Sequence, residues 1–144
     1  MEAAPSTTGS TERRRGDQPL RVLVLDDNPD TVNTLATLLE TEGHVVQRSY
    51  SGNDALPATR LFRPDAILVD LAVPGMSGFA VAQAIRNTFT DIRRPLLIAI
   101  SGVWKDAPDQ RIAHQVGFDH YLAKPCDPGE VLRLLAAFRS SRPS

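Results

Sequence analysis

The stretch that decides the fold is Ala66-Ile67-Leu68-Val69-Asp70, four apolar residues that end in a carboxylate. A short apolar run followed by a turn signal, here Pro74-Gly75, predicts a buried strand. Three other apolar runs also end in polar side chains. The run at 21–25 ends in Asp26-Asp27, the run at 95–100 ends in Ser101, and the run at 120–123 ends in Lys124. In a parallel sheet these strand ends meet at one edge, where open α/β sheets place their chemistry.

The apolar runs alternate with segments that have helical spacing. Strands are predicted at 21–26, 45–49, 66–70, 95–100 and 119–123, and helices are predicted to begin near Asn28-Pro29, Asn53, Ser77-Gly78, Asp106-Ala107-Pro108 and Asp127-Pro128. Pro57 lies inside the second helix candidate, so we expect a late start or a kink there. Gly43 and Gly117 suit the ends of the first and fourth helices. This alternation predicts an α/β fold, a doubly wound five-stranded parallel sheet.

The two ends of the chain differ in composition from its middle. Residues 1–19 are rich in Ser, Thr, Gly, Glu and Arg and hold almost no large apolar side chain, so we expect a disordered N-terminal tail. Residues 140–144 form a short C-terminal tail. The segment 20–139 is predicted to be one domain, which suits a chain of 144 residues.

Composition and charge limit the functional classes. A formal net charge of -1 gives no general attraction to nucleic acid or to anionic membranes, so we expect neither direct nucleic-acid binding nor membrane insertion. No stretch has the apolar length of a membrane span or of a signal peptide core. The single cysteine, Cys126, excludes an internal disulfide and fits a reducing compartment. We therefore expect a cytoplasmic protein.

The predicted edge of the sheet gathers three carboxylates, those of Asp26, Asp27 and Asp70. Two unit charges about 4 Å apart repel by roughly 4 kcal/mol at an effective dielectric constant near 20, so a counter-charge is needed. A hard divalent cation with oxygen ligands, Mg²⁺, meets this need best. Lys124 adds a positive charge that can pair with Asp70. The metal, Lys124 and the hydroxyl of Ser101 could then hold a phosphoryl group on Asp70.

These residues carry a resemblance. From about Arg21 to Phe138, more than four fifths of its length, the chain resembles the receiver domain of bacterial two-component response regulators. The matching pieces are Val24-Leu25-Asp26-Asp27-Asn28, Asp70 with Pro74, Met76 and Gly78, Ile100-Ser101-Gly102, and Tyr121-Leu122-Ala123-Lys124-Pro125. The resemblance implies a flavodoxin-like (βα)5 fold. It also implies a phosphoprotein of phosphorelay signal transduction that accepts its phosphoryl group from a histidine kinase or a histidine phosphotransfer protein.

The resemblance also assigns roles to single residues. Asp70 matches the phosphate-accepting aspartate, and Asp26 with Asp27 matches the acidic pair that holds Mg²⁺ beside Asp70. The backbone carbonyl of Ala72 matches the remaining protein ligand of the metal. Lys124 matches the lysine that contacts the phosphoryl oxygens, through a Lys124-Pro125 peptide bond that is typically cis in the family. Ser101 and Tyr121 match the switch pair, a hydroxyl and an aromatic ring, while the backbone at Gly102 and Ala72 is expected to contact the phosphoryl group.

Other functions remain as alternatives. The chain could be the C-terminal receiver of a hybrid sensor histidine kinase, although the initial Met1 favours a stand-alone receiver whose downstream partner is unknown. A Mg²⁺-dependent aspartyl phosphatase would want a second acid at position 72, where this chain has alanine. A flavodoxin-like FMN carrier would place its phosphate against the acidic 26–30 segment, which would repel it. An interaction module that is not phosphorylated would not need the five polar groups at the predicted strand ends, which are Asp26, Asp27, Asp70, Ser101 and Lys124. As a receiver the protein is not an enzyme in the usual sense, because it catalyses only its own phosphotransfer and dephosphorylation.

Overall fold

The computed structural model describes residues 18–73, 76–90, 94–102, 111 and 114–141. Five strands form one sheet in the order β2-β1-β3-β4-β5, and every neighbouring pair is parallel. The strands are β1 (Arg21–Leu25), β2 (Val45–Ser49), β3 (Ala66–Asp70), β4 (Leu96–Ser101) and β5 (His120–Ala123). The predicted parallel α/β sheet is confirmed. The strands at 45–49 and 66–70 have the predicted bounds, β1 and β5 are each one residue shorter at one end, and β4 is shifted by one residue toward the C-terminus.

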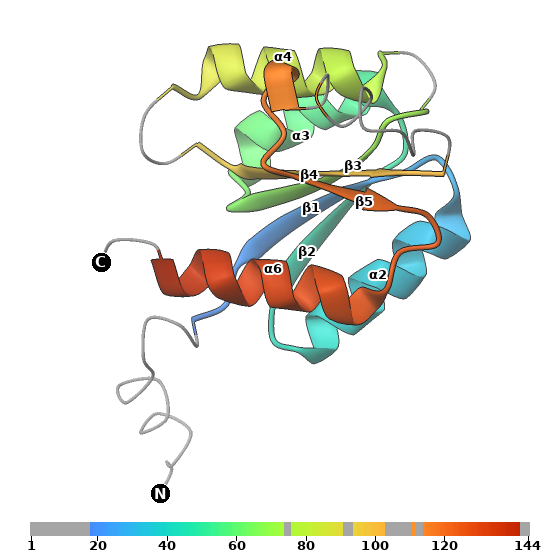
Figure 1. Cartoon of the computed structure of the whole chain (residues 1–144), viewed down its shortest axis with the longest axis vertical. Coiled ribbons are helices and arrows are strands. Elements are labelled where there is room, and N and C mark those ends of the chain that lie inside the picture. The colour runs from blue at the N-terminus through green and yellow to red at the C-terminus, as the bar shows by residue number, and fades with distance from the viewer. Residues whose placement is uncertain (1–17, 74–75, 91–93, 103–110, 112–113, 142–144) are drawn as a thin grey trace, which may run out of the picture.

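Helices cover both faces of this sheet (Figure 1). Helices α2 (Pro29–Thr41) and α6 (Pro128–Ser141) pack on one face, and α3 (Gly52–Phe62) and α4 (Gly78–Thr88) pack on the other. Between β4 and β5, residues 114–116 are helical and Gly117 ends them with a positive φ of 114°. The predicted start of that helix at 106–108 lies outside the described residues. No helix among the described residues combines the length and the apolar character needed to cross a bilayer.

Successive side chains of the central strands enter two separate cores. Val22 and Val24 of β1 pack beneath α2 and α6, whereas Leu23 and Leu25 pack beneath α3 and α4. Strand β3 alternates in the same way, and all five of its residues are buried. Because side chains of a strand point to opposite faces in turn, a sheet covered on both faces needs a continuous apolar run. This requirement explains why the stretch at 66–70 predicts the fold so well.

The expected late start of the second helix is wrong. Helix α3 begins at Gly52, where Ser51 caps it by accepting a hydrogen bond from the backbone N–H of Asp54, and Pro57 lies beyond its first turn. Proline removes one helical hydrogen bond, the one to the carbonyl four residues earlier, at Asn53. Asn53 is exposed, so water can hydrate its unpaired carbonyl and limit the cost of the lost hydrogen bond. Helix α3 accordingly continues through Pro57 to Phe62.

The predicted tails at 1–19 and 140–144 lie mostly in parts of the chain that the structure does not describe. Residues 1–17 and 142–144 lie outside the described residues, so the expected tails stay predictions. Leu20, just before β1, is 3% exposed and belongs to the core. Its backbone N–H donates a hydrogen bond of 3.0 Å to Nδ1 of His44, and Arg139 of α6 donates to the carbonyl of Gln18. Gln18 and Leu20 therefore contact the folded domain.

Candidate functional site

Strand register places the predicted site residues at one edge of the sheet. Leu25 of β1 lies opposite Val69 of β3, so the next residues, Asp26 and Asp70, stand side by side. The alternation of side chains along the strands extends to these positions. Asp26 continues the series of Val22 and Val24, and Asp70 continues that of Ala66 and Leu68. Both carboxylates therefore leave the sheet toward the α2 and α6 face.

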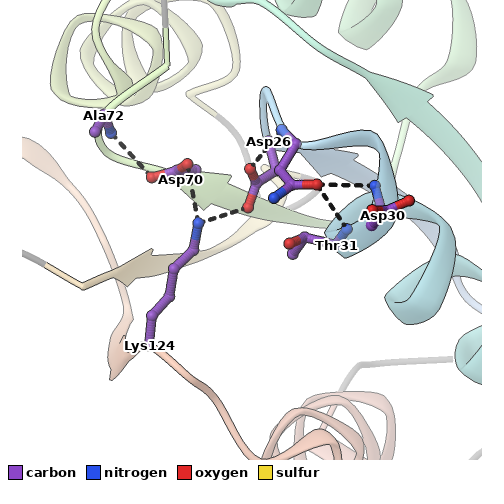
Figure 2. Close-up of polar contacts among 7 residues, drawn as sticks. Asp26, Asp30, Thr31, Asp70, Ala72 and Lys124 are labelled. Carbon is purple, nitrogen blue, oxygen red and sulfur yellow. Dashed lines mark hydrogen bonds and ion pairs between the residues drawn. The ribbon is translucent and has the colours of Figure 1, made fainter.

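Lys124 connects these two carboxylates (Figure 2). Its Nζ lies 2.8 Å from Oδ2 of Asp26 and 3.1 Å from Oδ2 of Asp70. The sequence predicted the pair with Asp70, and the structure confirms it. The shorter contact, with Asp26, was missed. Burial alone would lower the pKa of Lys124, but the hydrogen bonds to Asp26 and Asp70 outweigh it and raise the pKa above its ordinary value. The ammonium is therefore charged at neutral pH.

The carboxylate of Asp70 is held at both oxygens. Oδ1 accepts a hydrogen bond of 3.0 Å from the backbone N–H of Ala72, and Oδ2 accepts the one from Lys124. Asp70 is 5% exposed, and this burial raises its pKa above the ordinary value. The charge of Asp26 raises it further, whereas the Ala72 N–H and Lys124 oppose the rise. The result is a poorly solvated carboxylate at the edge of the sheet whose burial disfavours its charged form.

Asp26 is fixed by the chain that follows it. Its Oδ1 accepts a hydrogen bond of 3.0 Å from the backbone N–H of Asn28. The Asn28 side chain in turn caps α2 by accepting from the N–H groups of Asp30 and Thr31, with Pro29 in the first turn, as the sequence predicted. Figure 2 shows this run of contacts from Asp26 to the start of α2. The carboxylate therefore has its orientation set by the helix cap.

Three carboxylates at this edge suit a metal ion. One oxygen each from Asp26, Asp27 and Asp70 lies within 4.8 Å of the other two. Asp26 and Asp70 are buried, while Asp27 is exposed and leaves the cluster open to water on its side. An oxygen-only set with room for retained waters fits Mg²⁺ better than a softer metal. The residues present therefore fit the ion that the sequence predicts.

The remaining predicted residues lie around the same edge. Ser101 is the last residue of β4, is fully buried, and lies opposite Ala123 in the register of β4 and β5. Tyr121 lies opposite Ala99 and packs against the core beneath α3 and α4, so it shares a sheet face with Ser101, two residues further along β4. Gly102 is exposed and close to Lys124, and Ala72 begins the loop after β3. The Lys124-Pro125 peptide bond is cis.

The contact between Lys124 and Asp26 could have been found from the sequence. In the alternation of β5, Leu122 belongs to the core beneath α2 and α6, so position 124 points to the same face as Asp26 and Asp70. A cavity of about 470 Å³ beside Lys124, in contrast, could not have been predicted from the sequence. It is lined by Asp30, Thr31, Thr34, Leu35, Ile100, Lys124, Pro125, Cys126 and Pro128. Its walls come from residues that are far apart in the chain.

We expect Asp70→Asn to stabilise the metal-free protein. Removing a buried charge beside Asp26 should raise the free energy of unfolding at pH 7 by on the order of 1 kcal/mol, as measured by urea denaturation with a chelator present. A raised pKa means that the ionised carboxyl opposes folding, so the gain should shrink as the pH falls and the wild-type group becomes protonated. Asp30→Asn, an exposed carboxylate nearby, should give no gain. A less stable Asp70→Asn variant at pH 7 would contradict this account of the site.

Comparison with known proteins agrees with this geometry. The family model of the response regulator receiver domain matches residues 22–136. The probable transcriptional regulatory protein TcrX of Mycobacterium tuberculosis is 37% identical over 129 residues, which are 88% of this chain but 53% of that protein. Protein PilH of Pseudomonas aeruginosa is 31% identical over 118 residues, 81% of this chain and 95% of that protein. The chain thus spans about half of the first relative and nearly all of the second.

Solved structures show the same fold. A CheY-like response regulator receiver domain protein from Methanospirillum hungatei superposes with a TM-score of 0.78 at 19% identity, covering 87% of this chain and 97% of that one. A putative response regulator from Chloroflexus aurantiacus gives 0.76 at 25% identity, covering 85% and 99%. With the family model matching most of its length, the chain belongs to the response regulator receiver domain family.

Proposed function

We propose that the protein accepts a phosphoryl group on Asp70 from the phosphohistidine of a histidine kinase or a histidine phosphotransfer protein. The new group then changes the affinity of the domain for a downstream protein. The observation that supports this best is the position of Asp70, a buried carboxylate at the carboxyl edge of the sheet between a second buried acid and a lysine. Such a carboxylate has a counter-charge and two hydrogen-bond donors in place before any ligand arrives.

In the proposed reaction an oxygen of Asp70 attacks the phosphorus atom of the phosphohistidine. A phosphorus–oxygen bond forms, the phosphorus–nitrogen bond breaks, and the imidazole leaves with the electron pair and is protonated. Burial raises the pKa of Asp70, which makes its ionised oxygen a stronger nucleophile. The ammonium of Lys124, 3.1 Å from Oδ2, is placed to neutralise charge on the transferred group. The chain is itself the phosphoryl acceptor, so the reaction releases the donor's histidine and makes no small-molecule product.

Mg²⁺ would be held by Asp26, Asp27 and Asp70 together with the backbone carbonyl of Ala72. When bound, the ion supplies the positive charge that draws the anionic donor toward three carboxylates. Asp26 and Asp27 follow β1 directly, so the ion's ligands come from two adjacent strands. Lys124 already shares Asp26 and Asp70, and it would keep Asp70 when the ion takes the place of the ammonium beside Asp26.

The proposed switch uses Ser101 and Tyr121. Phosphorylation takes Asp70 from about one negative charge to about two and adds acceptor oxygens. The hydroxyl of Ser101 is buried at the end of the neighbouring strand, on the other face of the sheet from the Asp70 carboxylate, so it donates to the new oxygens only by moving toward them. The backbone at Gly102 and Ala72 lies at the same edge. Because Tyr121 shares the sheet face of Ser101, a shift of the hydroxyl changes the space available to the ring. The phosphorylated and unphosphorylated states then differ on the surface around β5 and α6.

The relatives set the scope of this proposal. This chain covers 95% of PilH but only 53% of TcrX, so receivers similar to it occur in proteins of different length. The proposal therefore concerns the receiver and its phosphoryl chemistry. We infer a cytoplasmic location, a histidine kinase as the phosphoryl donor and a downstream protein partner from the general role of this family.

Acetyl phosphate with Mg²⁺ should add one phosphoryl group to the wild-type protein, as measured by intact-mass spectrometry. Asp70→Asn should abolish the added mass, because the nucleophilic oxygen is lost. Asp30→Asn changes an exposed carboxylate near the site in the same way and should label like the wild type. Removing Mg²⁺ with a chelator should also prevent labelling. Equal labelling of the Asp70→Asn variant would show that another residue is the acceptor.

The switch can be followed with fluorine NMR, since the chain has two tyrosines, Tyr50 and Tyr121. In protein labelled with 3-fluorotyrosine, beryllofluoride with Mg²⁺ should shift the resonance of Tyr121 and leave that of Tyr50, which is exposed after β2, unchanged. Ser101→Ala should reduce the shift at Tyr121 to a small fraction without preventing binding of the mimic. A Tyr121 resonance that stays in place when the mimic binds to the wild type would contradict the proposed switch.

A further inference from the structure

We infer that Gly52, at the first position of α3, is a positioning residue for the site, although it contacts none of the site's functional groups. The inference rests on the proposed function, because it concerns the same carboxylates and the same loop. Its basis is a close approach of two backbones. A Cβ atom on Gly52 would overlap the carbonyl oxygen of Met76 and lie 2.7 Å from the carbonyl carbon and 2.9 Å from Cβ of that residue.

This contact cannot be relieved by a side-chain rotation. The closest atoms of Met76 are backbone atoms, and real Cβ atoms essentially never come closer than 3.0 Å to another heavy atom. Any residue other than glycine must therefore move the first turn of α3 or the backbone at Met76. Gly52 itself is buried, so the contact is part of the packed interior and not a loose surface encounter.

The first turn of α3 is tied to the acidic end of β1. The backbone N–H of Asp26 donates a hydrogen bond of 3.1 Å to the carbonyl of Ser49, the last residue of β2. The hydroxyl of Ser49 donates to the carbonyl of Ser51, which caps α3 just before Gly52. A displacement of Gly52 therefore reaches the backbone of Asp26 through two hydrogen bonds.

On its other side Gly52 meets the segment that carries Asp70 and Ala72. Met76 lies two residues before Gly78, whose N–H donates to the carbonyl of Leu71 and whose own Cβ would lie 2.7 Å from Cα of Leu71 and 2.8 Å from the carbonyl oxygen of Asp70. The start of α4 is therefore packed directly on the backbone of the proposed acceptor. Gly52 packs against Met76, two residues before that contact.

Gly52 is thus linked to both halves of the proposed metal site, to the Asp26 half through the hydrogen bonds of Ser49 and to the Asp70 half through Met76. Its missing side chain lets α3 and Met76 approach closely. Helices α3 and α4 lie next to each other on the face of the sheet opposite to α2 and α6 (Figure 1). The consequence is specific. A side chain at this position should separate the halves and weaken metal binding by more than its effect on stability explains.

Gly52→Ala tests this inference by two readouts on the full chain, the dissociation constant for Mg²⁺ by calorimetry and hydrogen exchange of the backbone at 71–78. We expect at least tenfold weaker Mg²⁺ binding and faster exchange at the N–H groups of Leu71, Ala72 and Gly78. Gly129→Ala is the matched control, because a Cβ there meets nothing closer than 3.4 Å and should leave both readouts unchanged. Val131→Ala, which truncates a fully buried core side chain of α6, separates lost stability from lost positioning.

Wild-type exchange at 71–78 in Gly52→Ala would overturn the inference, whatever the metal does. Wild-type Mg²⁺ affinity in that variant would do the same. A weakening equal to that of Val131→Ala at equal stability would reduce Gly52 to a structural role. If the wild type itself binds no Mg²⁺, the proposed function fails, and the exchange readout still decides on Gly52. Should Gly52→Ala not fold, Met76→Gly makes the backbone on the other side of this contact more flexible without a clash and should accelerate exchange at 71–78.

Discussion

The structure depends on one electrostatic arrangement, a single ammonium shared by two buried carboxylates. Asp26 and Asp70 are 3% and 5% exposed, and Lys124 lies within 3.1 Å of an oxygen of each. Without this ammonium, two poorly solvated negative charges would face each other across adjacent strands, which costs several kcal/mol. The fold therefore carries a destabilising charge cluster and compensates it with a cation from a third strand. That compensation also means that an added cation must compete with Lys124 for Asp26.

The parallel sheet is what allows this arrangement. Strands β1, β3 and β5 enter the site at one level because their carboxyl ends share an edge, and the alternation of side chains sends Asp26, Asp70 and Lys124 to one face. Ser101 and Tyr121 lie on the opposite face of the same edge. The charged groups of the site thus lie on one face of the sheet, and the proposed switch pair lies on the other. Helix α2 adds rigidity, since its cap at Asn28 orients Asp26.

Most of this arrangement is predictable from the sequence, because the apolar runs that end in polar residues specify both strand position and edge. The strand ends at 66–70 and 21–25 are sufficient to single out Asp70, Asp26 and Asp27. Pro57 misleads because the cost of a proline depends on whether water reaches the carbonyl that it leaves unpaired, which the sequence does not show. The role of Gly52 has no sequence signal either, since its partner backbone at Met76 lies 24 positions away and meets it only in the packed fold. Tertiary approach of this kind has no local pattern.

The competition between Lys124 and a metal ion is the most direct test of this account. Titration of the unphosphorylated protein with Mg²⁺ by calorimetry compares the wild type with Lys124→Met, which keeps most of the side chain's length and removes its charge. The account predicts roughly tenfold tighter Mg²⁺ binding in the variant, equivalent to about 1.4 kcal/mol, because Asp26 and Asp70 lose their internal cation. Arg60→Met, which removes an exposed positive charge from α3, should change the affinity little. Equal or weaker Mg²⁺ binding in Lys124→Met would contradict it.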